Sequence, residues 1–170
     1  HHLDGTNPTV LLSNSRFDIH QAVPAAGGGS NSRVSFTVPS LPAGLYQVAV
    51  QVIRPGESDP RLSNTLALVI GPEITTPMPM AVVRDGSGSA TIVLSVQPQV
   101  QPGQSASLLL GTTEVPLAPI TVATGTLTVA IPGAAAGEFL LRVRVDGIDS
   151  PIIDRSAVPP VFYNHRVTIT

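Results

Sequence analysis

Hydrophobic residues alternate with polar or small ones along several short segments of the chain. Successive side chains of a β-strand point to opposite faces, so this alternation predicts strands that are buried on one side and solvated on the other. Alternation without helical periodicity indicates antiparallel sheets that pack face to face. The clearest run assigns one set of residues to a buried face and the residues between them to the opposite face: Tyr46, Val48, Val50 and Val52 inside, Gln47, Ala49 and Gln51 outside.

The alternating segment occurs twice. Residues 34–52 are similar to residues 127–145, and the offset of 93 positions is constant across strand, turn and strand. A repeat of this length is a whole small domain, because solenoid repeats span roughly 20–50 residues. We therefore predict two β-sandwich domains in tandem, residues 1–71 and 72–170. The second copy has its own expected inward and outward positions: Phe139, Leu141, Val143 and Val145 inside, Arg142 and Arg144 outside.

Glycine and proline divide the chain into short β-rich runs at a spacing of about 8–12 residues, which is typical of all-β sandwiches and barrels. We expect a flexible loop at 27–32 and turns at 85–89, 101–104 and 146–147, where the sequence contains Gly with Ser, Asp or Pro. Strands are expected at 9–13, 16–20, 33–38, 45–53 and 64–70 in the first domain. In the second domain they are expected at 81–84, 90–96, 106–110, 126–131, 138–145 and 161–170.

The first copy carries a tyrosine where a sandwich enters its late central strand. In immunoglobulin-like (Ig-like) sandwiches such a tyrosine bonds through its hydroxyl to the preceding turn, and we expect Tyr46 to do so. Phe139, its counterpart, has no hydroxyl and keeps only the packing. The second copy extends further on its N-terminal side than the first, so we expect the first Ig-like domain to lack its opening strand. His1 and His2 then fit either a tag remnant or native loop residues.

Composition restricts the classes of partner. Charged residues make up 12% of the chain, the formal net charge is −2, and the nine basic residues are all arginine. This charge gives no electrostatic attraction for nucleic acid or acidic lipid. The longest apolar runs are too short to span a bilayer, and the chain has no cysteine for disulfides or thiol chemistry. We expect no nucleic-acid partner and no membrane insertion.

Histidine and serine do not combine into a recognisable catalytic pattern. A Ser-His-acid triad needs a nucleophile, a base and an orienting acid in contact, and the sequence contains no Gly-x-Ser-x-Gly elbow. His20 and His165 fall at the ends or outward positions of expected strands, so we interpret them as exposed or edge side chains. The sequence therefore predicts no catalytic residue, no cofactor and a protein that is not an enzyme.

Three aspartates, Asp146, Asp149 and Asp154, form a candidate cation site. Calcium prefers several oxygen ligands that converge from one loop. Isoleucines interrupt this cluster and no glutamate closes it. We therefore favour a hairpin turn with solvated carboxylates, keep a weak cation site as the alternative, and assign no metal ligand. The N-terminal residues His1, His2 and Asp4 fit either a transition-metal site or a frayed terminus.

Arg142 and Arg144 form a small basic stripe on the outward face of their strand. Without interleaved aromatic residues the stripe does not resemble a nucleic-acid platform, and we interpret it as a solvated face or as half of an interface with an acidic partner. Sugar binding by stacking is also weakly indicated, because the chain has no Trp and only two Tyr. Arg33, Arg84 or Arg155 could lie near the arginine stripe. The two tyrosines are Tyr46 and Tyr163.

The sequence also resembles a known family. Two tandem sandwiches with an Ala-Gly-x-Tyr/Phe corner resemble Ig-like domains of the IPT/TIG type. More specifically, Arg-Val-Arg-Val-Asp-Gly-Ile-Asp-Ser-Pro at 142–151, followed by Asp-Arg-Ser at 154–156, is similar to the C-terminal region of tail-terminator (cap) proteins of bacterial phage-tail-like contractile injection particles. The similarity extends over most of residues 72–170 and loosely over the first 71. The terminator domain itself has no counterpart in this sequence.

The resemblance implies a non-enzymatic structural or protein-interaction module that forms a C-terminal appendage of a cap protein. It implies protein partners, either particle subunits or further copies of the chain. It also implies a location in the bacterial cytoplasm during assembly or on the released particle. It supplies no catalytic, cofactor or metal-binding residue. Two other interpretations stay open: a bacterial cell-surface adhesion or carbohydrate-binding Ig-like module, and an accessory domain of a secreted hydrolase.

Overall fold

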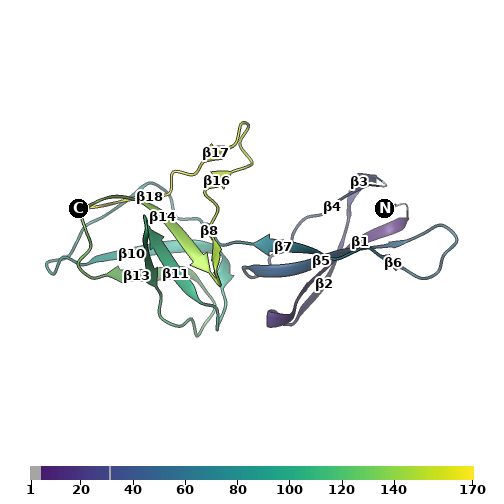
Figure 1. Cartoon of the computed structure of the whole chain (residues 1–170), viewed down its shortest axis with the longest axis horizontal. Coiled ribbons are helices and arrows are strands. Elements are labelled where there is room, and N and C mark those ends of the chain that lie inside the picture. The colour runs from purple at the N-terminus through teal and green to yellow at the C-terminus, as the bar shows by residue number, and fades with distance from the viewer. Residues whose placement is uncertain (1–4, 31) are drawn as a thin grey trace. The chain divides into compact units, whose positions relative to one another are not determined.

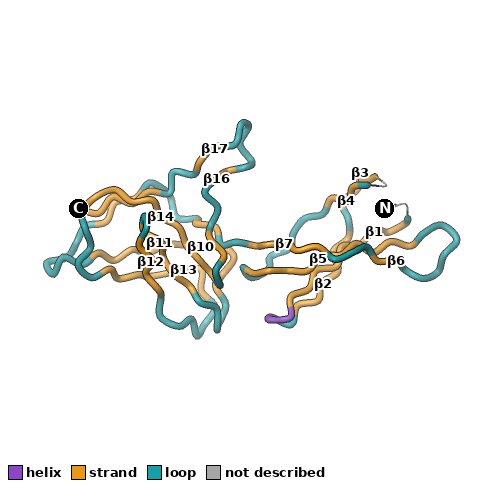
Figure 2. Tube along the Cα trace, viewed as in Figure 1, coloured by secondary structure: helices purple, strands orange, loops and turns teal. Residues whose placement is uncertain are grey.

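The computed structural model describes residues 5–30 and 32–170 and contains strands joined by turns and loops (Figure 1). The expected all-β class with antiparallel sheets is confirmed. The only helix within the described residues is one 3₁₀ turn, η1 (Ser15–Phe17), drawn in purple in Figure 2. None of the described helical structure is long and apolar enough to cross a bilayer. The chain divides into two compact units between Ile70 and Gly71.

The first unit contains a five-stranded sheet in the order β2-β1-β5, with β6 and β7 on the far side of β5. All pairings in this sheet are antiparallel. A separate antiparallel hairpin is formed by β3 and β4. The strands of this unit are β1 (Thr6–Asn14), β2 (Ile19–Pro24), β3 (Ala26–Ser30), β4 (Arg33–Ser35), β5 (Gly44–Ile53), β6 (Arg61–Leu62) and β7 (Leu66–Ile70).

The core of the first unit lies on one face of this sheet. Val10 and Leu12 of β1 and Tyr46 of β5 are buried there against Leu41, which belongs to the segment between β4 and β5. Phe36 from the same segment packs against the cluster and is half-buried. The layer that covers the sheet is thus formed by irregular chain as well as by strands. The predicted inward face of β5 is confirmed, with its ends buried and its middle half-buried: Tyr46, Val48, Val50 and Val52.

The second unit contains two sheets, one in the order β13-β10-β8 and one in the order β12-β11-β14-β18-β9, with β15 paired to β14. The pairing of β18 with β9 is parallel. The strands are β8 (Glu73–Ile74), β9 (Met80–Val82), β10 (Ala90–Val100), β11 (Ala106–Leu110), β12 (Thr113–Pro116), β13 (Thr124–Ile131), β14 (Gly137–Val145), β15 (Ile148–Asp149) and β18 (Arg166–Ile169). A separate hairpin is formed by β16 (Ile153–Asp154) and β17 (Val161–Phe162).

The two sheets of the second unit bury one face each and form a core of aliphatic side chains. Ile92 and Leu94 of β10 and Leu141 and Val143 of β14 have an exposed fraction of 0%. Burial alternates with exposure along both strands, as the sequence predicted. Phe139 differs from its expected inward neighbours because it is only half-buried. Val145 of β14, which was also predicted to point inward, is buried, and so are Ala90 and Val96 of β10.

The strand predicted at 16–20 is wrong at its start. The side-chain oxygen of Asn14 accepts hydrogen bonds from the backbone N–H groups of Arg16 (2.9 Å) and Phe17 (3.4 Å), which caps η1. Asp18 then adopts a left-handed backbone with φ of 51°. A local side-chain bond of this kind competes with strand pairing, so β2 begins only at Ile19.

The flexible loop predicted at 27–32 is also wrong over most of its length. The backbone of Ala26–Ser30 forms β3 and pairs with β4 across an irregular register. In turn, the strand predicted at 33–38 ends at Ser35, and the strand predicted at 161–170 is divided into β17 and β18. Glycine weakens a strand because it has no side chain to pack. Its backbone N–H and C=O groups can still pair with a neighbouring strand, and here they pair with β4.

Candidate functional site

The β16–β17 hairpin and its flanking residues form a projection of the second unit, residues 151–164, which we call the arm. The arm extends away from the two sheets of this unit (Figure 1). Its ladder contains two residue pairs, Ile153 with Phe162 and Asp154 with Val161. Below the ladder, the N–H of Tyr163 donates a 3.0 Å hydrogen bond to the carbonyl oxygen of Ile152. The arm therefore holds residues 155–160 at the end of a short two-stranded stem.

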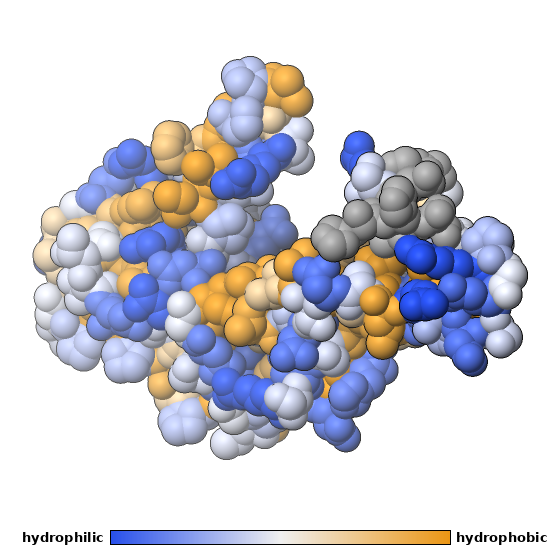
Figure 3. Space-filling view, turned by 45° about the vertical axis from the view of Figure 1, so that its right-hand side comes forward, coloured by the Kyte–Doolittle hydropathy of each residue, from blue (hydrophilic) through white to orange (hydrophobic). Residues whose placement is uncertain are grey.

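The arm exposes an unusual share of apolar surface. The exposed fraction is 97% for Val158, 76% for Phe162, 50% for Val161 and 43% for Ile152. Single exposed hydrophobic residues are ordinary, whereas four of them within one short projection make that projection a candidate for contact with another molecule. Figure 3 shows hydrophobic residues at the end of this projection. The arm is thus the first candidate for contact with another molecule.

The carboxylate of Asp154 fixes the turn that leads into the tip of the arm. The Oδ1 atom of Asp154 accepts hydrogen bonds from the hydroxyl of Ser156 (2.6 Å) and from its backbone N–H (2.8 Å). These bonds, the hydroxyl bond first, hold the pKa of Asp154 below its ordinary value. The side chain is therefore ionised near neutral pH, and it fixes the turn while it remains partly exposed to solvent.

The base of the arm rests on a stacked aromatic pair. The rings of Tyr163 and His165 are parallel within 5°, with their centroids 4.8 Å apart. His165 is buried, with an exposed fraction of 8%, so the prediction of an exposed or edge histidine is wrong for this residue. Loss of solvent lowers the pKa of His165, and the nearby charge of Glu73 opposes that shift. His165 is thus a neutral packing residue at the junction of arm and sheet.

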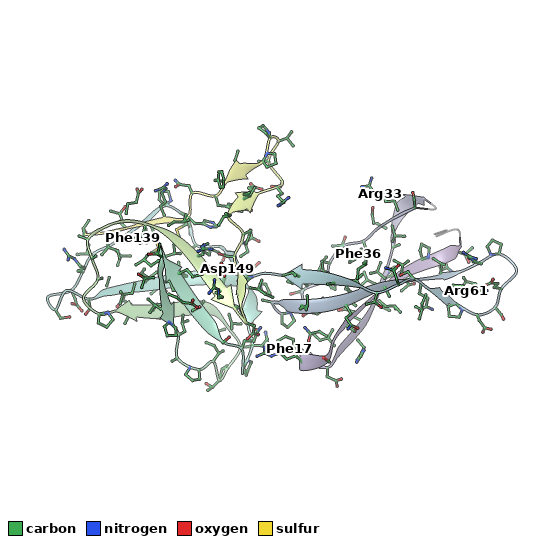
Figure 4. The ribbon with its side chains drawn as sticks, viewed as in Figure 1. Phe17, Arg33, Phe36, Arg61, Phe139 and Asp149 are labelled. Atoms are coloured by element: carbon green, nitrogen blue, oxygen red, sulfur yellow. The ribbon has the colours of Figure 1, made fainter. Side chains whose placement is uncertain are left out.

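The predicted arginine stripe is held by acidic residues. Arg144 donates through Nε to Oδ1 of Asp149 (2.6 Å), and Arg142 donates through Nη1 to Oδ2 of the same carboxylate (2.7 Å). Arg144 also bonds Glu114 at 2.8 Å, and Glu114 accepts from the hydroxyl of Ser107 at 2.6 Å. Figure 4 labels Asp149, which belongs to the second unit. The hydrogen bond to Asp149 raises the pKa of Arg144.

This network corrects two expectations. The stripe is not a solvated face, because the side chains of Arg142 and Arg144 are about one-third exposed or less and are ion-paired within their own unit. Asp149 is not a solvated carboxylate, because it accepts from both arginines. The arginines lie across the ladder from Leu109 and Ser107 of β11, both of which are buried although they point away from the core. The network therefore covers the outer face of the sheet.

The three aspartates of the candidate cation site do not converge. Asp146 accepts hydrogen bonds from the side-chain amide of Gln104 (2.7 Å) and from the backbone of Ser105 (3.0 Å), while the other two carboxylates bind the groups described above. Within residues 5–30 and 32–170, no group of three or more His, Asp or Glu side chains is placed to hold a metal ion. The expected hairpin turn is confirmed, since Asp146 and Gly147 both have positive φ.

Four further groups of residues considered in the sequence are not part of the arm. His20 is exposed, as expected, and its Nε2 atom lies 3.8 Å from Oδ1 of Asp18. Arg84 donates to the carbonyl oxygens of Thr170 and Ala134, and Arg33 belongs to the first unit. His1, His2 and Asp4, for which a metal site was the alternative, lie outside the described part of the chain.

A shallow hollow lies at the base of the arm. Arg142 and Arg155 line it together with Ile152, Ile153 and their neighbours. Protein-protein interfaces usually have an apolar core and a charged rim. The arm and this hollow together have that composition. The arm was not predicted from the sequence. Its available signal was the Val-Pro-Pro-Val-Phe run at 158–162, in which apolar residues adjoin prolines that prevent a long strand.

The arm lies within the part of the chain that matches a protein family. No curated protein matches the chain. The family described as "Domain of unknown function (DUF8756)" matches residues 72–169, which is more than half of the chain and includes the arm, both sheets of the second unit and the arginine network. The chain therefore belongs to the DUF8756 family.

Proposed function

We propose that this chain is a non-enzymatic structural and protein-interaction module, and that it forms a C-terminal appendage of a cap protein in a phage-tail-like contractile injection particle. In this proposal the arm contacts a neighbouring subunit of the particle. The observation that carries it is the arm itself, because Val158 (97% exposed) and Phe162 (76% exposed) lie on a hairpin that projects from the body of its unit. Burying such side chains is a main source of binding free energy between proteins.

The resemblance to cap proteins supports the same assignment. Its two most specific segments, 144–151 and 154–156, include the end of β14, all of β15 and the start of the arm's tip. An Ig-like fold of the IPT/TIG type is part of the proposal. It is supported in the first unit by Tyr46, whose hydroxyl donates a 2.9 Å hydrogen bond to the carbonyl oxygen of Pro42.

The test begins with the full-length protein in its source cells. A tagged copy is purified, its partners are identified by mass spectrometry, and the eluate is imaged by electron microscopy. We expect sheath, tube and baseplate proteins together with rod-shaped particles. Recovery of the protein alone, or with glycans or envelope components, would refute the assignment to a particle.

Two matched variants then assign the contact to the arm. Val158→Asp places a charge at the tip of the arm, and Val83→Asp places the same charge at another valine that is 77% exposed and lies outside the arm. Both side chains are solvated, so we expect both variants to keep the melting temperature of the wild type. Only Val158→Asp is expected to lose the particle. Equal retention, or equal loss, would show that the arm is not the contact.

A further inference from the structure

Strand β13 lies at one edge of the β13-β10-β8 sheet, and one of its sides has no neighbouring strand among the described residues. Its partner on the other side is β10, in a register that pairs Leu94 with Leu127 and Ile92 with Val129. Unpaired N–H and C=O groups along such an edge form a template for another strand. This edge is separate from the arm and has no role in the function proposed above.

Hydrogen bonds of Ser95 indicate which backbone N–H and C=O groups of β13 point away from β10. Ser95 lies opposite Thr126, yet its N–H donates to the hydroxyl of Thr76 (2.6 Å) and its carbonyl accepts from the N–H of Thr75 (2.9 Å). Ser95 therefore points its backbone groups toward β8. Orientation alternates along an antiparallel pair, so Thr126 and the residues two and four positions later point their backbone groups away from β10.

The three outward-pointing residues differ in one respect. The hydroxyl of Thr124 caps Thr126, since it accepts from the N–H of Thr126 (3.1 Å) and donates to its carbonyl oxygen (2.8 Å). For Thr128 and Ala130, no hydrogen bond on the outward side appears among the contacts of the described residues. The free edge thus consists of two N–H donors and two C=O acceptors, with a built-in stop at Thr126.

Two other edge strands, β12 and β2, carry protection that β13 lacks. Edge strands are usually protected by charge, proline or small length. Strand β12 contains Glu114 and Pro116, and β2 ends at Pro24. Strand β13 has eight residues, Thr-Gly-Thr-Leu-Thr-Val-Ala-Ile, with neither charge nor proline. Its outward side chains at 126, 128 and 130 are exposed.

We propose that β13 pairs antiparallel with β13 of a second copy of this chain, around a two-fold axis at Val129. In this register Thr128 of each copy lies opposite Ala130 of the other, and the two residue pairs exchange four backbone hydrogen bonds. All four free groups of each strand are then used, and Thr126 stays capped. A second copy fits this edge because a neutral, uncharged strand meets itself without like-charge repulsion. The two three-stranded sheets join into one.

Residue-resolved hydrogen exchange of the full chain, followed by NMR over a range of protein concentrations, tests the pairing. We expect exchange at the amides of Thr128 and Ala130 to slow as concentration rises, in step with dimer formation measured by sedimentation velocity. The amide of Thr126 is an internal control, because it is already bonded within the monomer. A monomer at every concentration, or a dimer without slower exchange at these two amides, would overturn the proposal.

Charge variants test the register. Thr128→Lys/Ala130→Lys places like charges directly across the new pair and is expected to give a monomer, whereas Thr128→Lys/Ala130→Glu places opposite charges there and is expected to restore the dimer. The control Thr91→Lys/Val93→Lys puts two charges on the neighbouring strand β10. These lie about 14 Å from their counterparts, beyond the Debye length of about 8 Å, and are expected to leave dimerisation unchanged. Dimers of the Lys/Lys variant as strong as wild type, or no recovery with Lys/Glu, would contradict the register.

Discussion

The hydroxyl of Tyr46 is the polar group of a ring that is otherwise wholly buried, with an exposed fraction of 0%. Its bond to the carbonyl oxygen of Pro42 closes the turn before β5. Tyr46→Phe removes this bond and leaves the carbonyl unpaired, so we expect the first unit to lose about 1 kcal/mol of stability. Tyr46→Ala also removes the ring and is expected to cost about 3–5 kcal/mol. Urea unfolding distinguishes the two, and a Tyr46→Phe variant as stable as wild type would show that the bond contributes nothing.

His165 gives the second unit a dependence on pH. Burial holds the folded-state pKa below the ordinary value of 6.5, so below pH 6.5 the unfolded chain takes up a proton that the folded chain does not. The contribution of neutral His165 to the free energy of unfolding is therefore fully present above pH 6.5. It decreases as the pH falls from 6.5 through the lowered pKa. We expect His165→Phe, which keeps a ring against Tyr163, to flatten the curve of unfolding free energy against pH in that window. The exposed His20→Phe is the control and should retain the wild-type slope.

Strand β14 separates a buried face from a charged one, and two adjacent substitutions test this. Val143→Asp puts a carboxylate into the core, where Val143 is fully buried, and we expect a loss of more than about 4 kcal/mol and unfolding of the second unit. Arg142→Asp removes a partly exposed ion pair with Asp149 and is expected to cost about 1 kcal/mol. Thermal melting with circular dichroism gives both values. Similar losses would mean that the faces of β14 are wrongly assigned.

Long strands were predictable from the sequence because one-sided burial leaves a pattern. Strands such as β10 and β14 alternate over nine or more residues, and β11 was predicted with its bounds correct. Strands of two residues, such as β16, leave no period to detect. The arm was missed for that reason. Side-chain chemistry was harder still, since the pairing of Arg142 with Asp149 depends on a turn that returns β15 to β14.

At the scale of the whole molecule, electrostatic forces contribute little to the proposed association of two copies. The net charge is −2 at pH 7 and the sequence pI is about 6.0, so long-range repulsion between copies is weak. We expect the association constant of the β13 dimer to change by less than about twofold between low and high salt. The Thr128→Lys/Ala130→Glu variant should lose affinity as salt screens its new pairs. Sedimentation velocity across a salt series measures both, and a steep dependence in wild type would indicate charged contacts.

The position of β18 has a consequence for the order in which the second unit is built. Strand β18 is the last strand in sequence, yet it lies between β14 and β9, pairing with both. Its residues Val167 and Ile169 are buried in the core. During synthesis on the ribosome, this six-stranded sheet therefore lacks the strand that joins β14 to β9 until residues 166–169 have emerged. Until then β9 has no partner in that sheet, so the second unit closes only after β18 has been made.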